Sequence, residues 1–304
     1  MRDGCGAPRE LRLLLEEYLA RYTRNWKPLI EVDASRFDAV IVVGDTHGYP
    51  NATIKALRAA EEAGQGIAVF LGDYVDRGPY GVENLTLVLE AVIRGSAIAL
   101  RGNHESLHMN MYYGFYDEIV NKLGHAVIQT IADFYRALPL AALLRYGRGR
   151  NVFLVHGGIP CKLCLGGEEK PLTIDELMEI AKSSDVDPLE NPTALQLLWN
   201  DPRADIEWFA PSIRGPGIYY YGRKAWTEFM RVNNIAFMLR AHEAVDGIEI
   251  LKPDGDEVKP LDREKLNFSS LFGSVVTVFS SLYHGLRSAI IMLDGESLEV
   301  TYIK

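Results

Sequence analysis

Cysteine is scarce in this sequence, which holds only Cys5, Cys161 and Cys164 among its 304 residues. An odd and sparse set of thiols excludes a secreted scaffold of disulfides, and we therefore expect a cytoplasmic protein. Cys161 and Cys164 form a single CxxC pattern without the second pair of a structural zinc site. We interpret them as loop thiols without a catalytic role, which at most form an occasional disulfide.

Long apolar runs and an excess of positive charge are also absent. No run of about 18 apolar residues could span a membrane, and the N-terminus lacks the apolar segment of a signal peptide. The 41 acidic residues outnumber the 32 basic ones, which gives a net charge of −9. We therefore expect neither nucleic acid nor a membrane as a partner, so that any recognition of phosphate has to be local.

Three apolar runs of strand length end abruptly in polar residues and glycine. They lie in FDAVIVVGDTHG (37–48), GIAVFLGDYVDRG (66–78) and SAIALRGNHE (96–105). Helical patterns near 52–62 and 81–94 separate these runs. Continuous apolar strands that alternate with helices predict an α/β fold, with a βαβαβ unit whose parallel sheet is covered on both faces.

The sequence favours one domain that comprises residues 1–304, because we find no linker or internal repeat along it. Apolar residues at helical spacing over 7–22 predict a helix. We interpret residues 1–36 as an N-terminal helical extension that packs on this domain.

The middle of the chain predicts a second sheet. One or two helices should follow residue 106 and end near residue 138. A hairpin of strands at 138–147 and 151–158 should begin the sheet, and several later runs should complete it. Residues 160–217 predict a long loop segment that contains a helix at 173–183. We therefore expect two packed mixed sheets flanked by helices.

Oxygen and imidazole donors follow the predicted strands. They are, in chain order, Asp45 and His47, Asp73 and Asp76, Asn103 and His104, and then His156 and His242. Ligands usually bind where the strands of an α/β sheet end. Carboxylate, imidazole and carbonyl donors without thiolate suit manganese, iron or zinc. So many donors exceed the needs of one catalytic ion and predict two ions about 3.5 to 4 Å apart, bridged by a carboxylate.

Neighbouring side chains of an extended segment point in alternate directions, and this predicts which donors face the metal ions. Asp45 and His47 can converge on one ion while Thr46 points away. By the same rule, if Asn103 faces the metals, His104 is free to protonate a leaving group. Asp76 could hold that imidazole in its charged form.

Charge counting favours an anionic substrate. Two divalent ions carry four positive charges, of which Asp45, Asp73 and a bridging hydroxide cancel three. Arg77 and Arg214 add guanidinium groups, which match phosphate oxygens. Each motif alone could be an ordinary turn, an isolated histidine or a surface charge. Donors at several consecutive strand ends are hard to explain by folding alone, so we expect a phosphoryl group as the ligand.

With these motifs assembled, the sequence resembles the PPP family of metal-dependent serine/threonine protein phosphatases. GDTHG, GDYVDRG and LRGNHE stand in the family's order, followed by VFLVHGG, LLWNDP, IRGPG, LRAHE and TVFSSLYHG. The resemblance implies a metallophosphoesterase sandwich and two metal sites that share Asp73. It implies one ion on Asp45, His47 and Asp73, and the other on Asp73, Asn103, His156 and His242.

The same resemblance implies the catalytic roles. His104 would be the general acid, paired with Asp76. Arg77 and Arg214 would bind the phosphate, and Tyr283 would lie over the site. The segment SSLYHG (280–285) departs from the family's SAPNYCG, because it is one residue shorter and lacks the proline and the cysteine.

The implied activity is hydrolysis of phosphoserine and phosphothreonine in phosphorylated proteins or peptides. A hydroxide that bridges two manganese ions would attack phosphorus in line, with iron or zinc as alternative metals. A dinucleoside polyphosphate hydrolase and a catalytically silent scaffold are the alternatives, and GNHE instead of GNHD favours the protein phosphatase. The short chain without tails suggests a prokaryotic, archaeal relative, and the sequence names no regulatory subunit.

Overall fold

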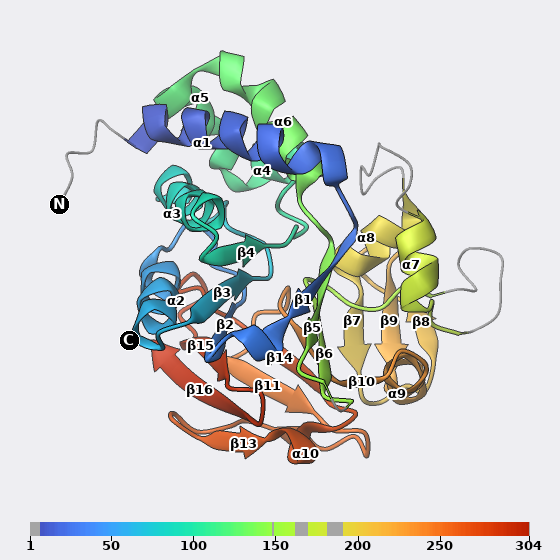
Figure 1. The fold of residues 1–304 in the computed structure, drawn as a ribbon. Coiled ribbons are helices and arrows are strands. Elements are labelled where there is room, and N and C mark those ends of the chain that lie inside the picture. Colours follow the sequence, from blue (N-terminus) through green and yellow to red (C-terminus); the bar gives the residue numbers. More distant parts are fainter. Residues whose placement is uncertain (1–6, 148, 162–169, 181–190, 304) are drawn as a thin grey trace.

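Two β-sheets packed face to face form the centre of the structure, a computed structural model that describes residues 7–147, 149–161, 170–180 and 191–303 (Figure 1). Helices pack on the outer face of each sheet, so that the layers follow one another as helix, sheet, sheet and helix. This architecture confirms the predicted α/β fold with two mixed sheets.

The first sheet contains the strands of the predicted βαβαβ unit. Its strand order is β13-β16-β15-β2-β3-β4. The strands β2, β3 and β4 run parallel, whereas β15 pairs with β2 in the antiparallel direction. The bounds, in sheet order, are Lys265–Asn267, Ser297–Ile303, Ser288–Leu293, Ala39–Val43, Gly66–Phe70 and Ala97–Ala99.

The second sheet includes the predicted hairpin of β5 and β6. Its strand order is β1-β5-β6-β10-β14-β11-β12. The hairpin is antiparallel, and β6, β10 and β14 run parallel to one another. The bounds, in sheet order, are Leu29–Asp33, Ala141–Arg145, Asn151–Val155, Ile235–Arg240, Val275–Val278, Ile248–Leu251 and Glu257–Val258.

Strand β2 shows why the sequence needs continuous apolar runs. Val40 and Val42 belong to the core between the two sheets, and Ile41 and Val43 belong to the core beneath the helices. Successive side chains of a strand point to opposite faces, so a strand that is covered on both faces is apolar throughout. Burial of each such side chain contributes about 1.5–3 kcal/mol. The sheets therefore hold their strand ends firmly.

Helices from the first half of the chain cover the first sheet. Ala52, Ala56 and Ala60 recur at every fourth position of α2 and are buried, which lets this helix lie close to β2 and β3. Helix α1 packs on α3 and α6. The bounds of α1 to α6 are Ala7–Tyr22, Asn51–Glu62, Gly81–Ile93, Leu107–Tyr113, Phe115–Leu123 and Ile128–Ala137.

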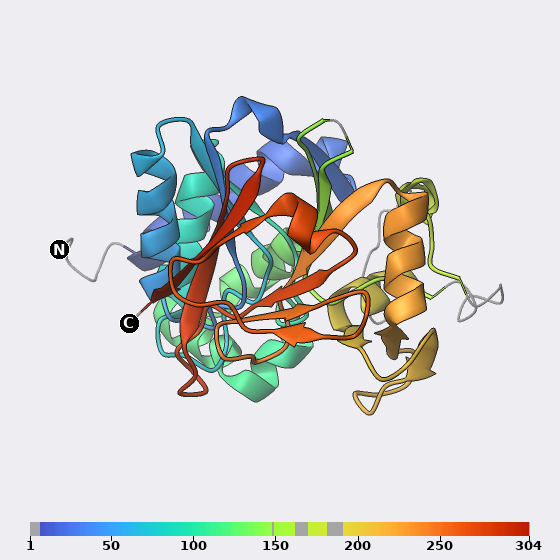
Figure 2. The ribbon, with the colours of Figure 1, turned by 90° about the horizontal axis from the view of Figure 1, so that it is seen from below.

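A smaller layer covers the second sheet. Figure 2 shows α9 and α2 on opposite sides of the paired sheets. A short three-stranded sheet in the order β7-β9-β8 belongs to the same layer as α9. The bounds of α7 to α10 are Ile174–Ile180, Pro192–Trp199, Arg223–Val232 and Phe268–Leu271. Those of β7, β8 and β9 are Asp201–Arg203, Phe209–Pro211 and Tyr219–Gly222.

Two segments differ from the sequence predictions. The supposedly helical residues 1–36 include strand β1, which pairs in parallel with β5 at the edge of the second sheet. A five-residue, half-buried edge strand gives too short a pattern to detect.

Three α-helices instead of one or two lie between 107 and 137, because Gly114 and Gly124 adopt φ values of 106° and 80° that interrupt the helical run. The helix predicted at 173–183 is described up to Ile180.

Candidate metal centre

The predicted donors meet where strands of both sheets end. Asp45, Asp73 and Asn103 follow β2, β3 and β4, whereas His156 and His242 follow β6 and β10. A backbone bridge between Asp45 and Phe279 joins the two sheets at this edge. The motifs therefore converge although they span almost 200 residues of the chain.

The backbone at this edge is strained. Seven non-glycine residues in the described part of the chain have a left-handed φ, and five of them belong to the site: His47, Asp73, Asp76, Arg77 and His242, with φ values of 47°, 55°, 69°, 66° and 68°. Such conformations cost about 1–3 kcal/mol each and persist only where the surrounding structure enforces them. The turns are shaped to direct side chains rather than to lower the energy of the backbone.

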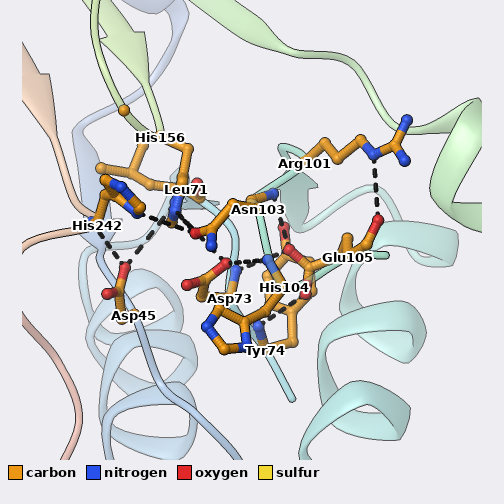
Figure 3. A network of polar contacts seen from close by, with 12 residues as sticks. Asp45, Leu71, Asp73, Tyr74, Arg101, Asn103, His104, Glu105, His156 and His242 are labelled. Atoms are coloured by element: carbon orange, nitrogen blue, oxygen red, sulfur yellow. Dashed lines mark hydrogen bonds and ion pairs between the residues drawn. The ribbon is translucent and has the colours of Figure 1, made fainter. Parts of the chain in front are cut away.

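One group of donors surrounds Asn103 (Figure 3). Its Oδ1 lies 2.8 Å from His156 Nε2 and 2.9 Å from His242 Nδ1. One ligand atom each of Asp73, His156 and His242 lie within 4.8 Å of one another. The residues expected to hold the second ion are therefore together.

A second group surrounds His47. Its Nε2 lies 3.8 Å from Asp45 Oδ2 and 3.7 Å from Asp73 Oδ2. Ligand atoms of His47, Asp73 and His104 also lie within 4.8 Å of one another. Asp73 is thus common to both groups, as the expected bridge requires, and Asp45 lies between them, 3.9 Å from His156 Nδ1.

The histidine tautomers fit a bound cation. His47 Nδ1 and His156 Nδ1 each lie 3.0 Å from a backbone carbonyl, of Val75 and Leu71 respectively. A carbonyl only accepts, so each Nδ1 carries the hydrogen and each Nε2 of the neutral ring presents a lone pair to carboxylate or amide oxygens. A cation satisfies such converging lone pairs. In His242, Nδ1 faces Asn103 Oδ1, and the buried Nε2 has no hydrogen-bond partner.

The electrostatics of the buried donors point the same way. Burial raises the pKa of Asp45 to about 7, and burial together with the Asp45 and Glu105 charges raises the pKa of Asp73. Burial lowers the pKa of His47 and of His156 well below the ordinary value. Divalent metals bind neutral imidazoles and ionised carboxylates. A bound ion would offset the free-energy cost of burying the charged carboxylates.

The His104 side chain is held by Asp76. Its Nδ1 lies 2.7 Å from Asp76 Oδ2, and the pair is buried. Asp76 is fixed in turn, because it accepts hydrogen bonds from Asn110 Nδ2 (2.9 Å) and from the backbone N–H of Phe115 (3.0 Å). Burial lowers the pKa of His104, and the Asp76 hydrogen bond opposes this effect. Since Nδ1 faces Asp76, Nε2 is the nitrogen available to a ligand.

Two residues that position the site have no predicted role. Glu105 accepts hydrogen bonds from the backbone N–H groups of Asp73 (2.8 Å), Tyr74 (3.0 Å) and Gly102 (2.7 Å) and thereby ties the β3 and β4 loops together. Asn84 donates to Thr46 Oγ1 (2.9 Å), so that Thr46 indeed points away from the donors. Glu105 stands inside the LRGNHE motif, which could have identified it, whereas Asn84 lies in a helix without any signal.

A pocket opens over the donors. It is lined by residues of the loops that follow the strands and of helices α4 and α8, namely Asp45, His47, Asp73, Arg77, Asn103, His104, Met109, Tyr113, Trp199, Arg214, His242, Ala244, Phe279 and His284. Both predicted phosphate-binding arginines are among them. Asp45 and Asp73 are its only carboxylates among the described residues.

The two arginines are held in different ways. The Arg77 guanidinium lies 4.4 Å from the ring centre of Tyr113 and 5.3 Å from that of Tyr283. Arg214 forms an ion pair with Asp201, which also binds the buried Arg240 at 2.8 Å. Tyr113 and Asp201 were not predicted, although LLWNDP contains Asp201.

Tyr283 lies beside the pocket and is not part of its lining. It is 41% exposed and does not line the pocket, where the next residue, His284, does. Its ring contacts Arg77 instead.

Of the two thiols of the CxxC pattern, Cys161 lies within the described residues. Cys161 is buried, and its backbone N–H donates to Gln196 Oε1 at 2.7 Å. Cys5 and Cys164 lie outside the described residues, as does most of the segment between Cys161 and α7.

Fold and donor set together define a metallophosphoesterase. The family model of calcineurin-like phosphoesterases matches residues 39–246, and the chain belongs to this family. The match begins at β2 and ends just beyond His242, so that it includes every predicted metal ligand.

Among curated proteins, the chain is similar to serine/threonine phosphatases. It is 34% identical over 210 residues to the serine/threonine-protein phosphatase 6 catalytic subunit of Caenorhabditis elegans, covering 68% of this chain and 59% of that protein. It is also 34% identical over 212 residues to "Probable serine/threonine-protein phosphatase" of Encephalitozoon cuniculi, covering 68% and 43%. The match thus spans about half the length of these relatives. Both are eukaryotic, which gives no support to the expected prokaryotic origin.

Solved structures share the fold. A protein serine/threonine phosphatase from Saccharomyces cerevisiae has a TM-score of 0.76 at 22% identity, over 98% of this chain and 90% of that chain. A cold-active protein-tyrosine phosphatase of Shewanella has a TM-score of 0.52 at 16% identity, over 90% and 82%. No helix among the described residues is long and apolar enough to cross a membrane.

Proposed function

We propose that this chain is a metal-dependent phosphatase that hydrolyses phosphoserine and phosphothreonine in proteins or peptides. The observation that carries the proposal is the buried pair of His104 and Asp76 beside two groups of metal ligands, in a pocket that also contains Arg77 and Arg214. The serine/threonine phosphatase names of two relatives at 34% identity support the same activity.

Two divalent ions are part of the proposal. We assign Asp45, His47 and Asp73 to one ion, and Asp73, Asn103, His156 and His242 to the other. Manganese is the proposed metal, and iron or zinc suit the same donors. When bound, the ions supply positive charge to the phosphoryl oxygens and lower the pKa of a water molecule.

His104 acts as the general acid. Its Nε2 gives a proton to the seryl or threonyl oxygen as the bond between that oxygen and phosphorus breaks and water takes its place on phosphorus. Asp76 orients the ring through Nδ1 and stabilises its charged form. Among the residues that line the pocket, no serine, cysteine or lysine is present as a covalent nucleophile, which supports direct hydrolysis.

The arginines bind and orient the phosphoryl group. Guanidinium groups match two phosphate oxygens at once, and the two arginines reach the pocket from different loops, one after β3 and one between β8 and β9. Tyr283 supports this function by packing against the Arg77 guanidinium instead of touching the phosphate itself.

The test begins with removal of metal from the full chain and addition of Mn²⁺. We would then compare phosphate release from a phosphothreonine peptide with hydrolysis of diadenosine tetraphosphate. We expect release from the peptide that depends on the metal, with little cleavage of the nucleotide. The reverse preference would assign a dinucleoside polyphosphate hydrolase with the same residues, and no turnover of either compound would revive the silent scaffold.

A further inference from the structure

His284 reaches the pocket from the loop that connects β14 to β15. It lines the pocket together with Arg77 and Arg214. Its ring centre lies 4.7 Å from that of Tyr283 and 6.0 Å from that of Phe279. The two aromatic rings limit the directions in which the imidazole can point, so that this exposed side chain is partly ordered for an encounter with substrate.

The residue is a peculiarity of this chain within the pattern that it resembles. The family segment SAPNYCG has a cysteine between tyrosine and glycine, and SSLYHG has His284 in that place. Imidazole differs from a thiol because it is a strong hydrogen-bond donor and can carry positive charge near neutral pH. The substitution therefore adds a polar group to the wall of the pocket.

The structure gives His284 no other task. Neither ring nitrogen has a hydrogen-bond partner among the described residues. Arg287 of the same loop is bound to Asp246 at 2.9 Å and stacks on the ring of Tyr302 at 4.2 Å, so it is already engaged. His284 is the donor of this loop that lines the pocket.

The charges around His284 favour an anion. Arg77 is close enough to lower its pKa in addition to the effect of burial, and no carboxylate of the described residues lines the pocket outside the metal centre. Arg77 and Arg214 are the proposed partners of the scissile phosphoryl group. A second anionic group on the same substrate would then meet an imidazole beside it.

We propose that His284 is a specificity-determining residue whose ring N–H donates to a second anionic group of the substrate, next to the scissile phosphate. This inference rests on the proposed function. The shared chemistry is an anionic oxygen, and it has two sources in a peptide, namely the carboxylate of a neighbouring acidic residue or the phosphate of a second phosphorylated residue. Either charge state of the imidazole keeps at least one N–H for this contact.

The experiment compares three phosphothreonine peptides. In the first, both neighbours of the phosphothreonine are aspartate, in the second both are asparagine, and in the third one neighbour is phosphoserine. We would measure kcat and KM for the wild-type protein loaded with Mn²⁺, for His284→Ala and for His284→Asn, which keeps an N–H donor. His125→Ala is the matched control, because this exposed histidine on the helical side of the molecule does not line the pocket.

We expect His284→Ala to raise KM for at least one anionic peptide about three- to fivefold, the range of an exposed charged contact, and to change the asparagine peptide less than twofold. His284→Asn should restore part of the loss, and the control should change nothing. A loss on the aspartate peptide identifies the carboxylate as the source, and a loss confined to the phosphoserine peptide identifies the phosphate.

An equal loss on all three peptides would overturn the proposal, because His284 would then act on the scissile phosphate or on Arg77. Unchanged constants on all three would overturn it as well. Both outcomes leave the proposed function intact, since the wild-type protein turns the peptides over. Absence of wild-type turnover on every peptide would refute the proposed function itself, and this inference with it.

Discussion

The metal centre and the rim of its pocket are built by different physical means. The metal centre, which we define as Asp45, His47, Asp73, Asn103, His156 and His242, consists of side chains that are at most slightly exposed. The pocket rim, defined as the lining residues Tyr113, Arg214 and His284 together with Tyr283 beside them, is partly or largely exposed, with both tyrosines at 41%. In the centre almost every donor contacts another, whereas the rim relies on ring contacts and one partly buried ion pair.

This difference decides how each region tolerates change. A hydrogen bond to a buried charged group contributes about 1.5–3 kcal/mol, and a partner left without it costs more. An exposed cation–π contact contributes about 0.5–1 kcal/mol. The centre should therefore fail as a unit, and the rim should vary one residue at a time. The first four of the five predictions below test this contrast, and the fifth concerns a carboxylate outside both regions, in order from the largest expected effect to the smallest.

Asp73→Asn should have the largest effect, because Asp73 belongs to both ligand groups. We expect the protein to lose most of both ions and turnover to fall by roughly a thousandfold, equivalent to about 4 kcal/mol. Metal content is measured by elemental analysis after dialysis, and turnover on a phosphothreonine peptide. An unchanged ratio of metal to protein would contradict a bridging role.

His104→Asn should separate chemistry from metal binding. We expect kcat to fall by about 10²- to 10⁴-fold while both ions are retained, because the imidazole is assigned to proton transfer alone. His125→Asn provides the control for loss of an imidazole elsewhere. Undiminished kcat would remove the assignment of His104 as the general acid.

Glu105→Gln should weaken the centre without touching a ligand. The carboxylate accepts hydrogen bonds from three backbone N–H groups, and an amide in its place turns one acceptor into a donor that faces them. We expect metal affinity to fall by about 10- to 100-fold, and the metal-free protein to lose about 1–3 kcal/mol of unfolding free energy. Metal titration and urea unfolding measure the two effects, and an unchanged affinity would show that the loops hold their shape without Glu105.

Tyr283→Ala should show how little the rim contributes. Loss of its ring from the Arg77 guanidinium should raise KM about two- to fivefold at unchanged kcat. Tyr283→Phe keeps the ring and should stay within twofold of the wild type. If Tyr283→Phe were as impaired as Tyr283→Ala, the hydroxyl would be contacting the substrate and the rim would resemble the centre.

Glu249→Gln should give the smallest effect, on stability alone. Burial and the neighbouring Glu257 raise the pKa of Glu249 in the folded chain to about 7, above the ordinary 4.5. A raised carboxyl pKa means that the folded state binds the proton more tightly, so stability falls as pH rises from about 4.5 to 7. Because the group is half-exposed, we expect Glu249→Gln to gain only about 1 kcal/mol at pH 8 and nothing at pH 4, measured by thermal unfolding. Equal effects at both pH values would contradict the shift.

Much of the centre could be predicted from the sequence because its residues lie within a few positions of apolar strands. Strand ends converge by topology alone, so Asp45, Asp73 and Asn103 needed no knowledge of loop structure. The alternation rule likewise separated Thr46 from its neighbours. The α/β sandwich followed from the same continuous apolar runs.

The rim and the supporting contacts could not be predicted in the same way. Tyr113 reaches Arg77 only because Gly114 ends α4 where it does, and Asp201 reaches Arg214 across a loop. Strand β1 was missed because five half-buried residues at a sheet edge leave a weak pattern. Such features depend on how distant segments meet, and local patterning does not contain that information.

The most direct test of the central claim is electron paramagnetic resonance during titration of the metal-free protein with Mn²⁺. Two ions that share Asp73 as a ligand lie close enough for their spins to couple, so we predict a spin-coupled spectrum that reaches its maximum at two equivalents and is absent from Asp73→Asn. A spectrum of isolated, uncoupled Mn²⁺ at every ratio would contradict a two-metal centre at the joined ends of the sheets.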